Sequence, residues 1–421
     1  MIQISPAVLL RQFRANQTLI AICITTAIVM MGQGIISPVL PLFTQEFGVN
    51  MTMIGVTVAV FSLGRIFFNV PAGVVAEKFG RRIVLVGGLL IITVASMLMA
   101  LSSSYVELNI WRFFTGVGSA IYLTGALTVM ADISASDNRA RYMSYQQGAL
   151  LFGAGFGPAL GGIAAEMWGF HSAFYALAGI SLIGLIWAYV QIPETARAKA
   201  ARVTPPAATP PAPKPREVGT LRSMIALVTN LNFMLVSFYF FMVVFTRNGG
   251  RGSIMPLLGD AQVGLGPAEI GVAFTTMAFV NFGTVIPAGW LADRYGRKAL
   301  MLPGGIITAL GLVMFLFSTN FPLFLLASVV LGIGVGAVGP SPAAFVADAA
   351  PDGGRGLAIG LFRTFGDIGG MVGPILLGWL VDVGAFDWAM HTNAALVLIS
   401  AAAVALFVTE AKSSRAVRIS Q

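Results

Sequence analysis

Apolar residues fill this chain in long continuous blocks that alternate with short polar stretches. Most blocks hold roughly 20 to 25 residues, the length that an α-helix needs to cross a hydrocarbon core of about 30 Å. Membrane-spanning strands would instead need short segments of alternating polarity. The pattern predicts twelve transmembrane helices, at 17–42, 51–76, 83–102, 105–131, 142–166 and 170–192, and at 225–257, 266–291, 299–318, 321–347, 356–381 and 388–409.

The composition indicates the same class of protein. Of the 421 residues, 57% are hydrophobic and only 10% are charged, whereas soluble domains have about 25% charged residues. So few charges could not cover a water-soluble globule of this size. The single cysteine, Cys23, excludes a disulfide within the chain and a cluster of cysteine ligands. We expect an all-α integral membrane protein in a lipid bilayer, with no metal and no cofactor.

The positions of the basic residues predict the orientation. Twenty of the 25 lysines and arginines lie at the N-terminus, in alternate loops or at the C-terminus, and cytoplasmic loops collect such residues. The opposite loops carry acidic residues, namely Glu46, Glu107, Glu166, Asp260, Asp382 and Asp387. We therefore expect a multi-pass protein of a bacterial inner membrane with both termini in the cytoplasm. The net charge of +8 follows from this topology, so no nucleic-acid partner is expected.

A segment rich in proline and alanine, 204–216, lies at the midpoint of the chain. Proline removes backbone donors and favours extended chain, which is typical of a solvated connector. The sequence thus predicts a first six-helix bundle at 1–192, a cytoplasmic linker at 193–224 and a second bundle at 225–421.

The two predicted bundles are related by an internal repeat, in which one constant shift along the chain lays the first bundle on the second. The shift places Pro71 on Pro287, Asp132 on Asp348, and the pair Gly157-Pro158 on Gly373-Pro374, among other matches. Two parallel six-helix repeats are typical of transporters whose substrate site lies between them near the bilayer midplane. The repeat favours a transporter over a membrane enzyme or a receptor.

The loops after the second and eighth predicted helices carry the same motif. The first copy contains Gly73, Glu77, Gly80, Arg81 and Arg82, and the second contains Gly289, Asp293, Gly296, Arg297 and Lys298. These residues resemble a signature of the major facilitator superfamily, and the resemblance covers essentially the whole chain. It implies the major facilitator fold and a conformational latch in which the carboxylates and arginines form ion pairs that release between states. Glu77 stands where the family usually has aspartate.

Further motifs resemble the twelve-span drug:proton antiporters of that superfamily. The fifth predicted helix carries an antiporter-like motif made of Gly153, Gly157, Pro158, Gly161 and Gly162. Small residues also let membrane helices approach closely, and proline kinks them, so packing alone could account for this motif. The link to export comes from the resemblance.

Five arginines lie inside predicted helices, at positions 65, 112, 247, 251 and 363. Each costs roughly 3 kcal/mol or more at the bilayer centre unless it faces a cavity or a partner. Arg65, Arg112, Arg247, Arg251 and Arg363 are therefore candidates for function, with structural ion pairs or positions near a helix end as the alternative. The resemblance implies that Arg112 takes part in proton transfer.

Asp367 is the only carboxylate that we predict deep in the membrane, about 16 Å into its helix. Arg363 precedes it by four residues, on the same helix face. Two interpretations stay open. The pair is either a closed structural pair, or Asp367 titrates during transport with its charge held by Arg363 or Arg112.

The deep charges favour a neutral or anionic solute, because five arginines face one carboxylate and the first predicted helix has no acidic residue. The polar residues Gln33, Asn69 and Asn281 either line the cavity or bridge helices. We expect a monomeric secondary active transporter that exports a small organic solute, a drug-like compound or a metabolite, in exchange for protons. An uptake symporter or facilitator and a non-transporting sensor are the alternatives.

The sequence gives no support for an enzyme. It shows no nucleophile with a matching base, and no phosphate-binding loop of the kind that would use ATP directly. The G-x-G-x-x-G pattern at 334–339 lies inside an apolar block and does not follow a strand.

Overall fold

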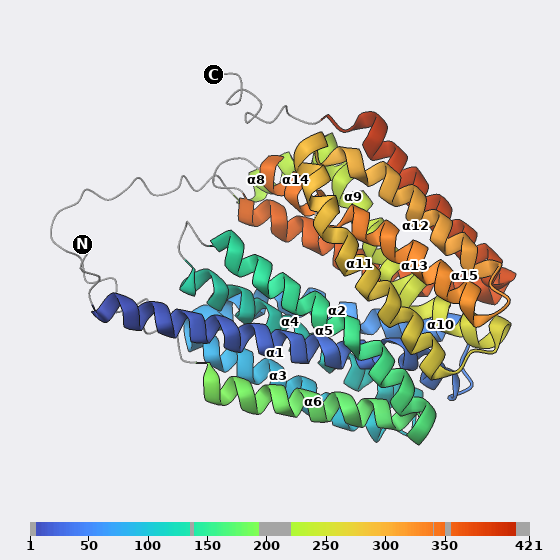
Figure 1. Ribbon diagram of the computed structural model, residues 1–421, viewed down its shortest axis with the longest axis horizontal. Coiled ribbons are helices and arrows are strands. Elements are labelled where there is room, and N and C mark those ends of the chain that lie inside the picture. Colours follow the sequence, from blue (N-terminus) through green and yellow to red (C-terminus); the bar gives the residue numbers. More distant parts are fainter. Residues whose placement is uncertain (1–5, 135–138, 193–219, 340, 350–354, 410–421) are drawn as a thin grey trace.

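The computed structural model describes residues 6–134, 139–192, 220–339, 341–349 and 355–409, and within them every regular element is a helix (Figure 1). The first six are α1 (Pro6–Gln45), α2 (Met51–Phe79), α3 (Arg81–Ala100), α4 (Tyr105–Ile133), α5 (Arg139–Trp168) and α6 (Phe170–Gln191). After the predicted linker, most of which lies outside the described residues, come α8 (Thr220–Val228), α9 (Leu231–Phe245), η1 (Thr246–Ile254), α10 (Met255–Leu258), η2 (Gly259–Val263), α11 (Pro267–Tyr295), η3 (Lys298–Leu300), α12 (Met301–Leu316), α13 (Phe321–Val338), α14 (Ser341–Ala349) and α15 (Arg355–Phe407).

Eleven helical segments among the described residues are long and apolar enough to cross a membrane. The last, Ala358–Phe407, has 50 residues and is two helices that join at Ala385, where φ is 70° and ψ is 179°. The predicted helices 356–381 and 388–409 lie on its two parts. The number of crossings, twelve, stays a prediction.

The backbone repeats itself at the same shift that the sequence shows. Gly80 and Gly296, which follow α2 and α11, have φ of 105° and 101° with ψ of 152° and 153°. Gly169, between α5 and α6, has φ of 81°, and the equivalent residue Ala385 has φ of 70°. The break within α15 is therefore the second copy of the α5–α6 junction.

The helices separate into two groups, α1–α6 and α8–α15 (Figure 1). The main contacts between the groups pair α2 with α15 and α5 with α11. These two pairs are equivalent under the repeat, because α2 matches α11 and α5 matches the first part of α15. The halves thus meet through two copies of one helix crossing.

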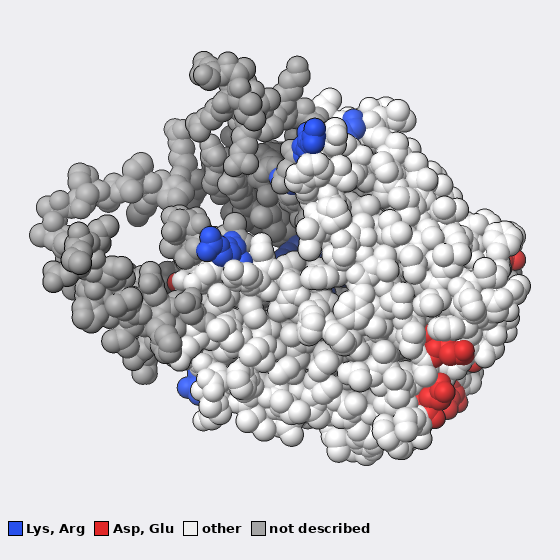
Figure 2. All heavy atoms as spheres, in the orientation of Figure 1, with Lys and Arg blue, Asp and Glu red and all other residues white. Residues whose placement is uncertain are grey.

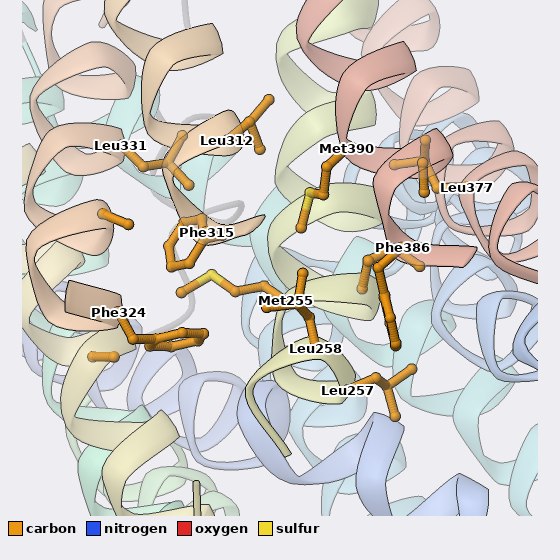
Figure 3. Packing of buried hydrophobic residues seen from close by; sticks show 14 of the residues in the cluster. Met255, Leu257, Leu258, Leu312, Phe315, Phe324, Leu331, Leu377, Phe386 and Met390 are labelled. Carbon is orange, nitrogen blue, oxygen red and sulfur yellow. The ribbon is translucent and has the colours of Figure 1, made fainter. Parts of the chain in front are cut away.

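Each group has an apolar core of its own. In the second group, Phe315 and Phe324 pack edge to face with their ring centroids 4.9 Å apart, and Met255 lies beside them (Figure 3). Leu42 and Ile54 of the first group join this cluster, which ties the two groups together.

Two predicted helices are less regular than their apolar patterns suggest. The segment predicted at 225–257 breaks before α9, where the Asn230 side chain accepts a hydrogen bond from the Phe233 amide, and continues through the wide π-helical turns of η1. A second π-helical element, η2, lies just beyond the predicted end. The segment predicted at 321–347 is interrupted at Gly339, where φ is 41°. Hydropathy indicates which residues are buried in lipid, but it carries no information on such local changes in helix winding.

Charged side chains collect at opposite ends of the molecule (Figure 2). At one end, called the basic end here, α2 and α11 end and α3, α5 and η3 begin. These helix ends carry the exposed or half-buried Arg82, Arg141, Arg294, Arg297 and Lys298. At the other, called the acidic end, α1 and α5 end, α4 begins, and η2 and the break within α15 lie. These positions carry the exposed Glu46, Glu107, Glu166, Asp260, Asp382 and Asp387. The surface is hollowed between the two groups of helices on the side of the basic end (Figure 2).

Candidate functional site

The buried carboxylate of Asp367 in α15 joins the two halves by contacting α2. Its Oδ1 lies 3.4 Å from Nη2 of Arg65, and its Oδ2 accepts a hydrogen bond of 3.0 Å from Nδ2 of Asn69. Arg65 and Asn69 are four residues apart, so α2 presents both to α15 from one face. Asp367 is 8% exposed, and a carboxylate buried to this extent requires such partners.

The ion pair of Asp367 differs from the pair within one helix that sequence spacing suggests. Among the described residues, Arg65 is the ion-pair partner of Asp367, while Arg363 is exposed. Arg363 and Arg247 both interact electrostatically with Arg65 and with Asp367. These residues form what we call the central cluster, namely Arg65, Asn69, Arg247, Arg363 and Asp367. The closed Arg363–Asp367 pair is not the arrangement observed.

The π-helical segment η1 carries two arginines and an asparagine, of which Asn248 and Arg251 are half-buried and Arg247 is exposed. Arg251 places its guanidinium 5.1 Å from the ring centroid of Phe274, and its charge interacts with that of Arg247. Asn248 donates hydrogen bonds of 3.3 Å to Ser62 Oγ in α2 and to the carbonyl of Gly370 in α15. Wide helical turns of this kind frequently occur at functional sites.

Sequence reasoning missed Asn248. The signal was available, because an asparagine inside a predicted membrane helix needs hydrogen-bond partners just as a charged residue does. What the sequence did not contain was the identity of those partners, which lie on two other helices.

Arg112 in α4 is buried, with 8% of its surface exposed. Its guanidinium lies 4.5 Å from the ring centroid of Phe61, one turn along α2 from Arg65. Its Nε and Nη1 atoms are buried without a hydrogen-bond partner among the described residues. Arg112 thus approaches the central cluster from the first half without pairing with Asp367.

The other polar candidates are Gln33 and Asn281. Nε2 of Gln33 is buried and has no hydrogen-bond partner in the described part of the chain. Asn281 is half-buried in α11. Within the described ranges, no hydrogen bond joins either side chain to the central cluster.

The antiporter-like motif forms the contact between α5 and its neighbours. A Cβ added to Gly153, Gly157 or Gly161 would collide with carbonyl oxygens of α1, those of Ala27, Met31 and Ile35. A Cβ at Gly162 would collide with the carbonyl of Pro267 in α11. The motif therefore lets α5 touch both α1 in its own half and α11 in the other.

The loop motif after α2 is tied to its own half. Arg81 donates to Asp132 of α4 over 3.0 Å and to the carbonyl of Ala76 over 2.7 Å. Arg82 donates to the carbonyl of Tyr189 and stacks on its ring, 4.8 Å from the centroid. The side chain of Glu77 lies outside the described residues.

The equivalent loop after α11 makes a different set of contacts. Lys298 donates to the carbonyl of Val408 over 2.6 Å, and Arg294 lies over the rings of Trp290 and Tyr295. The side chain of Asp293 lies outside the described residues. The latch role of both loop motifs stays a prediction.

A family model described as Major Facilitator Superfamily matches residues 22–249 and 240–420. The two matches cover almost the whole chain, one for each half. The chain belongs to the Major Facilitator Superfamily. It is therefore a membrane transporter by family and not an enzyme, as its sequence predicts.

Several superfamily members are similar over most of their length. Multidrug resistance protein 1 of Bacillus subtilis is 25% identical over 379 residues, covering 88% of this chain and 91% of that protein. The quinolone resistance protein NorA of Staphylococcus aureus is 22% identical over 373 residues, covering 87% and 91%. An uncharacterised MFS-type transporter of Methanocaldococcus jannaschii is 24% identical over 371 residues, covering 88% and 92%.

Solved structures of superfamily members share the fold. A bacterial homologue of the human lysosomal transporter Spinster, in an inward-facing and unoccupied conformation, has a TM-score of 0.75 at 14% identity, covering 93% of this chain and 96% of that chain. The human organic anion transporter MFSD10 has a TM-score of 0.65 at 15% identity, covering 93% and 99%. These likenesses confirm the all-helical major facilitator fold.

Proposed function

We propose that this protein is a secondary active transporter that exports a small organic solute in exchange for protons by alternating access. The observation that carries the proposal is the contact of Asp367 in α15 with Arg65 and Asn69 in α2. This contact crosses the boundary between the halves. A buried proton-binding group that sits on this boundary couples its protonation to the relative position of the halves.

The charge balance of the central cluster relates the proton to the solute. Asp367 accepts from Asn69 and pairs with Arg65; a proton on its carboxylate removes the ion pair and weakens the hydrogen bond. A neutral solute that donates a hydrogen bond to Asp367 competes with the proton, which is the relation that antiport requires. Competition of this kind supports a neutral solute for an exporter.

An anionic solute would give a different coupling. Protonation of Asp367 leaves the charges of Arg65, Arg247 and Arg363 uncompensated, so an anion binds better when the proton is present. Proton and anion would then move together, as in a symporter. The excess of arginines is the observation that keeps uptake symport as the second candidate function, and we expect little affinity for lipophilic monocations.

The related proteins support export of drug-like compounds, because two of them are named for multidrug and quinolone resistance. We further propose that residues 1–192 and 225–421 move as two rocking units joined by the linker 193–224. The basic end faces the cytoplasm of a bacterial cell in this proposal, with both termini on that side, and the transporter works as a monomer. Transport of a metabolite in place of a drug fits the same site.

Proteoliposomes with an imposed pH gradient test the proposal. The probes are a quinolone, the anionic dye carboxyfluorescein and the cation tetraphenylphosphonium. We expect the wild type to move the quinolone against the proton flow, and we expect Asp367→Asn to lose this coupled movement while still exchanging solute. Asp387→Asn is a matched control, because its exposed carboxylate lies on the same element, α15, far from the central cluster.

Three results would contradict the proposal. Full pH-driven transport by Asp367→Asn would remove this residue from proton coupling. Movement of carboxyfluorescein together with protons would favour the symporter. Absence of flux for every probe would favour a sensor that does not transport.

A further inference from the structure

The two halves are joined at the acidic end by a carboxylate that caps a helix of the opposite half. Asp382 of α15 accepts hydrogen bonds of 2.9 Å from the backbone amides of Met51 and Thr52, the first two residues of α2. The hydroxyl of Thr52 donates to the same carboxylate over 2.5 Å. One carboxylate from the second half thus holds three donors of the first half.

A second carboxylate makes the equivalent contact in the reverse direction. Glu166 of α5 accepts a hydrogen bond of 3.0 Å from the amide of Ala268, in the first turn of α11. The shift that relates the halves places Glu166 on Asp382 and Thr52 on Ala268. Each half therefore caps one helix of the other half with the same structural element.

Backbone packing surrounds both caps. A Cβ added to Gly378 would collide with the carbonyl of Met51, and one added to Gly162 would collide with the carbonyl of Pro267. These two glycines are equivalent under the repeat. The helices of the two halves touch directly beside each carboxylate, so the halves cannot part at this end without breaking the caps.

The first turn of α2 shows why its cap must come from the other half. Asn50 satisfies the amide of Met53 with its side chain and the amide of Ile54 with its carbonyl. The amides of Met51 and Thr52 use Asp382 instead. A helix N-terminus carries free donors and partial positive charge, which a carboxylate stabilises. When the halves separate, these donors lose their anionic acceptor.

We infer that Asp382 and Glu166 are positioning residues of the transport cycle, a pair of charge-assisted latches that hold the acidic end shut. The inference rests on the alternating-access part of the proposed function. Opening toward the side that the acidic end faces requires both latches to break, whereas opening at the basic end leaves them intact. The latches therefore favour the conformation in which the acidic end is closed.

Distance measurements by double electron–electron resonance test the latches. In a Cys23→Ser background, spin labels are placed at Gln45→Cys and Gln262→Cys, two exposed positions at the acidic end of the two halves. We expect Asp382→Asn and Glu166→Gln each to raise the ratio of long to short distances roughly fivefold, the effect of losing about one helix cap. The double variant should raise it roughly 25-fold if the two latches act independently.

Two further variants make the result specific. Thr52→Val removes only the hydroxyl donor and should shift the ratio in the same direction by less. Glu107→Gln is the matched control, because Glu107 accepts from Ser103 in its own half and makes no hydrogen bond or ion pair with the other half in the described structure. We expect its ratio to equal that of the wild type.

An unchanged ratio in both Asp382→Asn and Glu166→Gln would overturn the latches. Gly378→Val, which forces the junction apart sterically, separates this outcome from failure of the proposed function. If Gly378→Val lengthens the distance between the labels and Asp382→Asn and Glu166→Gln do not, the proposal of alternating access is kept and the proposal of the latches is rejected. If the charge variants lengthen the distance while no probe is transported in proteoliposomes, the proposal of the latches is kept and only the proposal of export is rejected.

Discussion

The α5–α6 junction and the break within α15 occupy equivalent places in the two halves. The first uses Gly169 with φ of 81°, and the second uses Ala385 with φ of 70°. A backbone with positive φ and ψ near 180° suits glycine, while alanine adopts it at a cost of roughly 1–3 kcal/mol. The comparison teaches that the surrounding helices, and not the residue, impose this geometry on the second half.

The same two halves differ more strongly in their chemistry. The first half contributes the half-buried Arg65 and the buried Arg112, and the second contributes the buried Asp367 together with the exposed Arg247 and Arg363. The acidic group is present in one copy only. A symmetric scaffold thus carries an asymmetric site. Such a site lets the protonation of a single group depend on the relative position of the two halves.

The largest expected effect concerns a helix crossing that occurs once inside each half. In the first half α5 crosses α1, and in the second half α15 crosses α9. A Cβ at Gly157 would collide with Met31 in α1, and one at the equivalent Gly373 would lie 2.6 Å from the carbonyl oxygen of Phe245. One turn further, Gly161 touches α1 whereas its equivalent is Leu377. Gly161→Leu places the residue of the second half in the first and should destabilise the fold by about 3 kcal/mol or more, because a backbone collision cannot relax locally.

Yield of monodisperse protein from membranes measures this effect. The conservative control is Gly87→Ala in α3, since no atom lies within 4 Å of an added Cβ there. Wild-type yield from Gly161→Leu would show that the two crossings are interchangeable and that the close approach of α1 and α5 is not required.

The next effect compares Arg65 and Arg363, the two arginines that lie closest along α2 and α15 to a position for pairing with Asp367. Arg65→Ala removes the ion-pair partner and leaves the buried carboxylate with Asn69 as its hydrogen-bond partner among the described residues, which should lower the initial rate of proton-driven quinolone export at least roughly tenfold. Arg363→Ala removes an exposed charge and should lower it less than about threefold. Arg65→Lys should restore part of the rate. A larger loss of rate in Arg363→Ala than in Arg65→Ala would mean that Arg363, from the same half as Asp367, stabilises the charge of Asp367.

The smallest effect returns to the junctions. Gly169→Ala should lower the free energy of unfolding by about 1–3 kcal/mol, and Ala385→Gly should raise it by about 1 kcal/mol or less, because glycine relieves the strain but adds entropy to the unfolded chain. Thermal midpoints in one detergent measure both. Equal destabilisation by the two substitutions would show that Ala385 makes side-chain contacts that outweigh its backbone strain.

Much of the architecture could be predicted from the sequence. Apolar blocks placed the helices, because membrane thickness and helical rise fix the length of a crossing. One constant shift related the halves, and charged loops marked the two ends that Figure 2 shows. These properties are local or periodic along the chain, so they can be read without knowing which helices touch.

The partners of individual side chains were decided by the tertiary structure. Spacing along α15 favoured Arg363 for Asp367, yet the partner is Arg65 of α2. Asp382 and Glu166 could be seen in the sequence only as acids of the loops opposite the basic ones, although each caps a helix of the opposite half. Hydrophobic periodicity determines that a residue lies on a helix within the membrane, whereas the face of another helix opposite it depends on how all the helices pack together.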